Sequence, residues 1–174
     1  MRVVLTSLLL LVSTTAIAQM PYAGMQTRPI KALSEQQISD LNAGRGMGLA
    51  LAAELNGYPG PSHVLELADK LELSSDQRTQ VQALFASMKA EAQPLGSKLI
   101  AQETELDKLF ASRAITPDTL KASTTAIAIT NGELRETHLK YHLSTAAILT
   151  PTQMQRYAEL RGYGTDQPRH QHRH

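Results

Sequence analysis

The sequence contains no cysteine and no tryptophan, and aromatic residues make up only 4% of its 174 residues. The absence of cysteine excludes disulfides, thiolate metal ligands, a cysteine nucleophile and a lipid-modified cysteine. With so few aromatic side chains, a folded core has to be built from aliphatic residues and alanine. We therefore expect a thin core that depends on close packing, or on pairing with a second copy of the chain.

The chain also lacks a strong net charge, because its 17 basic and 16 acidic side chains leave a formal charge of +1. No polybasic patch stands out, so the charge pattern gives no reason to expect nucleic acid as a partner. A glycine-flanked serine elbow is missing. Gly44, Gly46 and Gly48 are closely spaced, but they fall inside a predicted helix and lack the preceding strand of a phosphate-binding loop. We therefore expect no catalytic residues and no required cofactor.

The first eighteen residues have the pattern of a secretory signal peptide. Arg2 gives a basic start, residues 3–12 form a short apolar run, and residues 16–18 match a small-residue cleavage site. This run is too short to span a membrane, and no other stretch is long and apolar enough. We expect export, cleavage after Ala18, and a soluble mature chain that begins at Gln19. Because Arg2 is the only charged residue of the segment, cleavage would leave 16 residues of each sign.

The remaining chain is predicted to be entirely helical. Residues 19–33 hold prolines, a glycine and scattered polar side chains, which predicts a flexible arm. Residues 34–162 form the expected helical domain, and residues 163–174 form a histidine-containing tail that we expect to be disordered. Hydrophobic periodicity and capping signals place the helices of the domain at about 34–55, 62–71, 75–112, 116–149 and 151–161.

Each of the two longest predicted helices carries a feature that should shape it. Pro94 lies inside the helix over 75–112 and should bend it, because its ring removes one backbone hydrogen bond and clashes with the preceding turn. In the helix over 116–149, an aliphatic row with a spacing of seven lies beside a polar row. A seam that is half polar packs weakly, and a second protomer is a natural source of a partner. The two rows are Leu120, Ile127, Leu134, Tyr141 and Ile148, and Thr124, Asn131, His138 and Thr145.

Two similar pentapeptides, Leu73-Ser74-Ser75-Asp76-Gln77 and Leu149-Thr150-Pro151-Thr152-Gln153, follow apolar helices. In each, the second residue is a good N-cap, and the glutamine three positions later can close a capping box onto it. Pro151 suits the first helical position. The repeated device predicts helices that are joined at sharp, capped corners.

The histidines are the strongest candidates for a binding site in this sequence. His138 and His142 are one helical turn apart, so both can face one metal ion. Spacing alone favours a surface or seam-edge pair over a metal site, and a third ligand would have to come from His63 or from a carboxylate such as Glu66. The glutamate that follows the first histidine of a metalloprotease helix is missing. A looser candidate for a divalent ion, or simply a solvated end, is the tail with His170, His172 and His174.

The export signal, the cysteine-free helical body and the two pentapeptides together resemble the LTxxQ-motif family of Spy/CpxP-type periplasmic proteins and related heavy-metal-resistance sensors. The likeness covers residues 48–162. The second pentapeptide matches the motif fully, whereas the first has Ser74 in place of the usual threonine. The resemblance implies a long, bent helical hairpin of about four helices, a cradle-like homodimer and a periplasmic location. Its motif residues here are Leu73, Gln77, Leu149, Thr150, Pro151 and Gln153.

The resemblance implies one of two functions. Our first expectation is an ATP-independent chaperone or envelope-stress adaptor that binds unfolded proteins, client proteins or a membrane signalling partner, although the neutral charge departs from the usual basic cradle. The alternative is a sensor or resistance protein that binds nickel, cobalt, zinc or copper through helix-borne histidines. In that branch, metal ligands precede each of the two motifs. Before the second motif, His138 and His142 fill this position. Before the first motif only His63 matches, and Leu67 stands four residues later. A non-catalytic structural protein is a third possibility.

Overall fold

The computed structural model describes residues 22–163, in which all regular secondary structure is helical. They are the 3-10 helix η1 (Met25–Thr27) and the α-helices α1 (Glu35–Asn42), α2 (Leu51–Glu54), α3 (Pro61–Glu66), α4 (Ser75–Ala111), α5 (Pro117–Ile148) and α6 (Pro151–Leu160). No strand occurs between residues 22 and 163, which confirms the predicted all-α class. The predicted signal peptide with its cleavage site, and the tail histidines His170, His172 and His174, lie outside the described residues.

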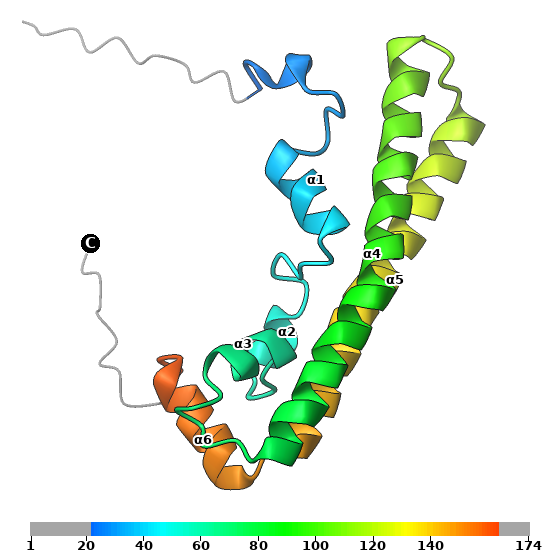
Figure 1. Cartoon of the computed structure of the whole chain (residues 1–174). Helices are drawn as coiled ribbons and strands as arrows, with labels where there is room; N and C mark the ends of the chain where they lie inside the picture. Colours follow the sequence, from blue (N-terminus) through cyan, green and yellow to red (C-terminus); the bar gives the residue numbers. More distant parts are fainter. Residues whose placement is uncertain (1–21, 164–174) are drawn as a thin grey trace, which may run out of the picture.

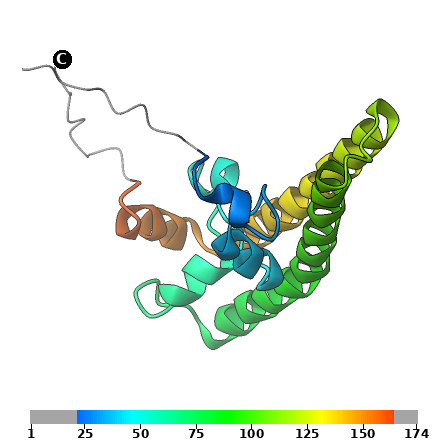
Figure 2. The same cartoon turned by 90° about the horizontal axis from the view of Figure 1, so that it is seen from above.

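Helices α4 and α5 form the long axis of the molecule (Figure 1). They lie side by side, run in opposite directions and are joined by a short turn over residues 112–116. Helix α4 continues unbroken past Pro94 and bends along its length (Figure 2), as expected for a helix with an internal proline. Helix α5 begins at the predicted position, with Thr116 as N-cap and Pro117 as its first residue. In the described chain, no helix has both the length and the hydropathy to cross a lipid bilayer.

The shorter helices cover only one half of the α4–α5 pair (Figures 1 and 2). Helix α1 packs on α4, whereas α3 contacts both long helices and α2 contacts α5. Two apolar clusters lie beneath this layer, one around Leu41, Leu99 and Leu134 and one around Val64, Val81 and Tyr157. The other half is a two-helix arm, defined here as residues 100–129, in which no side chain is fully buried.

The prediction of one helix over residues 34–55 is wrong. Helix α1 starts at the predicted position, where Ser34 and Gln37 form a capping box, but it ends at Asn42, and α2 starts only at Leu51. In the loop between them, Gly44, Met47 and Gly48 have φ angles of 66°, 43° and 82°. This left-handed region is favourable for glycine and incompatible with a continuing right-handed helix. The three glycines of residues 44–48 therefore belong to a loop and not to a helix.

Two other predicted boundaries also need correction. The helix expected over 62–71 is α3, which follows Gly60, has Pro61 as its first residue and ends at Glu66. The Ser62 hydroxyl donates to the Glu66 carboxylate and does not cap the helix. The expected flexible arm over 19–33 is packed at its end, because Ile30 and Leu33 are buried in the same apolar cluster as Leu41. The described chain has six α-helices, where periodicity and capping placed five and the resemblance implied about four.

The two pentapeptides meet in space, although only their separate capping boxes were predicted. Both boxes are present, and the glutamine amides also bond to each other: Gln77 Nε2 donates to Gln153 Oε1 at 2.9 Å, and Gln153 Nε2 donates to Gln77 Oε1 at 3.0 Å. Each Nε2 also donates to a backbone carbonyl near the other corner, that of Ile148 for Gln77 and that of Leu71 for Gln153. The start of α4 is thus tied to the start of α6.

We expect this glutamine pair to stabilise the fold cooperatively. Gln77→Leu or Gln153→Leu should each lower the free energy of unfolding by about 1–3 kcal/mol, because each leaves part-buried amide and carbonyl groups without partners. The loss in the double variant should be smaller than the sum of the two single losses, since both substitutions remove the same contact. Urea unfolding of the four proteins measures this coupling. Gln37→Leu is the matched control, because Gln37 closes an exposed capping box without a partner glutamine. Additive losses at 77 and 153 would contradict the prediction.

Candidate histidine pocket

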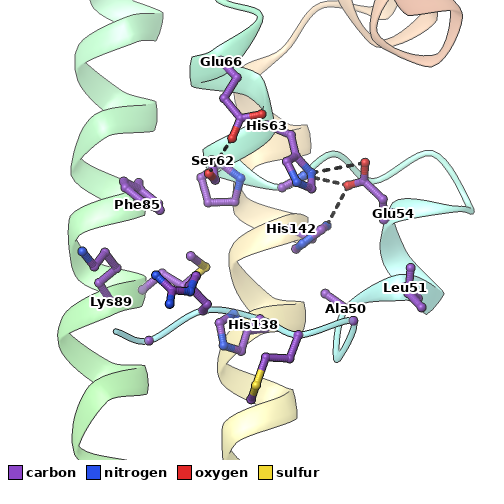
Figure 3. Close-up of a pocket in the computed structure, with 18 of the residues that line it drawn as sticks. Ala50, Leu51, Glu54, Ser62, His63, Glu66, Phe85, Lys89, His138 and His142 are labelled. Atoms are coloured by element: carbon purple, nitrogen blue, oxygen red, sulfur yellow. Dashed lines mark hydrogen bonds and ion pairs between the residues drawn. The ribbon is translucent and has the colours of Figure 1, made fainter. Parts of the chain in front are cut away.

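A cavity of about 610 Å³ lies between the α1–α2 loop, α2, α3, α4 and α5 (Figure 3). This volume is within the usual range of ligand-binding pockets, about 300–1,000 Å³. His63 from α3 and His138 and His142 from α5 all line it. The structure therefore brings together the three histidines that were singled out in the sequence, from segments more than seventy positions apart.

The interpretation of His138 and His142 as a surface or seam-edge pair is wrong, because their exposed fractions are only 2% and 8%. The α1–α2 loop, α2 and α3 cover this part of α5 and enclose the pair. Thr145 of the polar row is buried as well. Thr124, which lies in the two-helix arm, and Asn131, which lies next to it, stay exposed. The polar row thus finds part of its partner within the same chain.

One ring nitrogen of His142 is committed to the backbone and the other is not. Nδ1 lies 2.7 Å from the carbonyl oxygen of Tyr58. Since a carbonyl can only accept, Nδ1 carries a proton and donates, and in the neutral form of the ring the lone pair is on Nε2. A Cβ on Gly60 would lie 2.7 Å from Nε2, so the ring packs directly against this glycine and a larger residue there would displace it. A histidine that donates one N–H to a backbone carbonyl is the usual arrangement of a metal ligand.

His138 is the most deeply buried of the three, and its Nε2 has no hydrogen-bond partner among the described residues. Burial, and secondarily the neighbouring His142, lower the pKa of His138 below its ordinary value. The ring is therefore neutral at neutral pH. Gly46 of the loop approaches its other edge, and a Cβ there would lie 3.3 Å from Nδ1. Because buried polar atoms are rarely left without partners, a water molecule, an ion or another ligand is expected at this nitrogen.

Glu54 is the main side chain of the site that the sequence reasoning missed. It is 5% exposed, and its carboxylate accepts hydrogen bonds from the Tyr157 hydroxyl, from the Tyr163 hydroxyl at 3.2 Å and from the Gly60 amide at 3.2 Å. The nearest ring nitrogens of His63 and His142 lie 3.5 Å and 3.7 Å from its oxygens (Figure 3). One signal was available, since Glu54 is the only charged residue in the apolar run 49–55.

The carboxylate of Glu54 is ionised in spite of its burial. Burial alone would raise its pKa, but the adjacent His63 and Tyr157 outweigh that effect and lower the pKa to about 2. Arg161 Nε lies 3.6 Å away and adds a positive charge. Burial and then this carboxylate raise the pKa of Tyr157. Glu54 thus links α2 to the start of α3, to α5 and to α6 through one buried negative charge.

Glu66, the carboxylate that the sequence offered as a third ligand, lines the pocket but stands apart from this network and accepts a hydrogen bond from Ser62 at 3.2 Å. Within residues 22–163, no three His, Asp or Glu side chains are arranged as a set that could hold a metal ion by themselves. Two thioether side chains, Met47 of the loop and Met88 of α4, line the same cavity. The donors available to an ion are therefore both imidazole nitrogen and thioether sulfur.

Comparisons with protein-family models, with curated proteins and with solved structures found no match to this chain.

Proposed function

We propose that this protein is an exported, non-catalytic protein that binds a transition-metal ion in the histidine pocket, with the sensor or resistance role of the metal-binding branch. The observation that carries the proposal is that His63, His138 and His142 line one cavity. The unpartnered Nε2 of His138 and the oriented Nε2 of His142 support it, because neutral imidazole is the preferred nitrogen ligand of such metals. Glu54 would hold the layer that carries His63 against α5.

The test is a metal titration of a protein whose tail cannot bind, with His170, His172 and His174 replaced by asparagine. We expect one equivalent of Ni²⁺, Zn²⁺ or copper to bind, and His138→Leu or His142→Ala to weaken binding by about tenfold or more. Leu143→Ala is the matched control, because Leu143 follows His142 but is 57% exposed. Equal affinities in all of these proteins would overturn the proposal.

A second candidate function, the chaperone or adaptor role, is supported by the two-helix arm. Because α4 and α5 cover only one face of each other there, apolar side chains stay accessible: Phe110 is 54% exposed and Ile129 is 55% exposed. Contiguous exposed apolar patches typically mark protein-binding sites, and this proposal takes Phe110 and Ile129 to belong to one such patch. Under this proposal the arm binds unfolded clients, and a cradle-like homodimer shares the same surface.

We expect the protein to suppress aggregation of a denatured client without ATP, and the combined variant Phe110→Ser, Ile129→Ser to lose most of this effect. Leu143→Ser is the matched control, because Leu143 has a similar exposed fraction but lies outside the arm. Light scattering measures suppression, and sedimentation of the same variants tests the dimer. Unchanged suppression by the arm variant would contradict the second candidate, as would an equal loss in the control.

A further inference from the structure

We infer that the histidine pocket is selective for copper and holds it as Cu(I), with the thioethers of Met47 and Met88 as ligands beside His138. The inference rests on the proposed metal-binding function and names the ion and the additional ligands. Thioether sulfur is a soft donor that favours Cu(I), whereas zinc and nickel are served well by imidazole and carboxylate. In a chain without cysteine, methionine is the only source of such a donor.

The positions of the two methionines support a role in binding. Met88 is 6% exposed and comes from α4, which faces the α5 helix of His138 across the cavity. Met47 comes from the loop on the other side and is 42% exposed, so burial in the core does not explain it. Its φ of 43° is also unfavourable for a residue with a side chain, by roughly 1–2 kcal/mol. The strained loop therefore holds a sulfur side chain in the wall of the cavity.

The nitrogen partner in this set is His138. Its Nε2 is buried and has no hydrogen-bond partner within residues 22–163. Cu(I) is satisfied by a small number of soft ligands, so two sulfurs and one imidazole form a sufficient set. This composition agrees with the absence, in the described chain, of a metal-holding group made only of histidine and carboxylates.

The charges around the cavity also favour a monovalent ion. Arg45, Lys89 and Arg161 line it, against the carboxylates of Glu54 and Glu66. Glu54 is already engaged by Tyr157, Tyr163 and the Gly60 amide. With so little uncompensated negative charge, the desolvation of a divalent ion would be poorly repaid, whereas Cu(I) carries half the charge and binds sulfur largely through covalency.

The experiment is an anaerobic Cu(I) competition against a chromophoric Cu(I) chelator, run beside a Zn²⁺ titration, on the full chain with the three tail histidines replaced by asparagine. We expect one Cu(I) per chain, and Met47→Leu and Met88→Leu should each weaken Cu(I) binding by about tenfold or more while Zn²⁺ affinity stays within about twofold. These substitutions conserve volume, so the fold should be retained. Met154→Leu is the control, because Met154 packs against the cluster around Val64, Val81 and Tyr157 and does not line the cavity.

X-ray absorption of the copper-loaded protein gives an independent readout, since sulfur scattering at copper should be present and should disappear in the Met47→Leu, Met88→Leu double variant. Zn²⁺ or Ni²⁺ binding that depends on His142, together with unchanged Cu(I) affinity in the methionine variants, would overturn this inference and leave the proposed function standing. Failure of every ion to bind above the level of the His138→Leu variant would overturn both.

Discussion

Glu54→Leu is expected to lower the free energy of unfolding by about 3 kcal/mol or more, because it removes the buried carboxylate that joins α2, α3, α5 and α6. Breaking a buried, hydrogen-bonded ion pair by deleting one partner typically destabilises a protein by about 3–5 kcal/mol. Here the Tyr157 hydroxyl and the Gly60 amide would lose their acceptor. Arg161 and Tyr163 are only partly buried and can turn towards water, which places the loss at the lower end of that range.

The matched control is Glu66→Leu, which removes a carboxylate from the same cavity. Glu66 accepts one exposed hydrogen bond from Ser62, so its replacement should change stability by less than about 0.5 kcal/mol. Urea unfolding of the metal-free proteins measures both changes independently of ion binding. Equal losses in the two variants would show that Glu54 does not hold these helices together.

The elements that could be predicted are those specified by local sequence. Ser34, Ser74, Thr116 and Thr150 all cap helices as expected, because a capping box needs only residues three positions apart. Helices α4 and α5 are long enough for their periodicity to be unambiguous. The failure over residues 34–55 is also local in origin: the glycines weaken a helix, but the sequence does not show that the backbone turns left-handed at Met47.

The site depended on contacts between distant residues, which no spacing rule reports. The spacing of His138 and His142 correctly suggested a shared direction, but their burial follows from the α1–α3 layer. That layer is held by the Glu54 network and by the close approach of the Leu41 backbone to Gly96. Glu54 itself looks like the polar side of a short amphipathic helix. In the structure α2 is inverted, because Glu54 is buried while Leu51 and Leu55 are 54% and 60% exposed. The buried Glu54 carboxylate is favourable in this orientation because the Gly60 amide before α3 and the Tyr157 hydroxyl of α6 donate hydrogen bonds to it.

Gly96→Ala is expected to destabilise the protein by about 1–3 kcal/mol, although the same substitution stabilises most helices. A Cβ at position 96 would lie 2.3 Å from the carbonyl oxygen of Leu41 and 2.8 Å from its carbonyl carbon. These are backbone atoms, so relief requires α1 to move away from α4 and to loosen the cluster that contains Leu41 and Leu99. This loss has to exceed the roughly 1 kcal/mol that alanine gains over glycine in a helix.

Gly132→Ala, in the neighbouring helix α5, is expected to change the free energy of unfolding in the opposite direction. Gly132 lies inside α5, and a Cβ there would meet no other atom within 4 Å, so we expect a gain of about 0.5–1 kcal/mol from helix propensity alone. Chemical unfolding compares the two variants, and hydrogen exchange of the α1 amides should accelerate only in Gly96→Ala. A gain in stability at both positions would mean that α1 does not rest on α4 at this point. It would also remove the reason why the loop after α1 reaches the histidine pocket, since that loop is positioned by the end of α1.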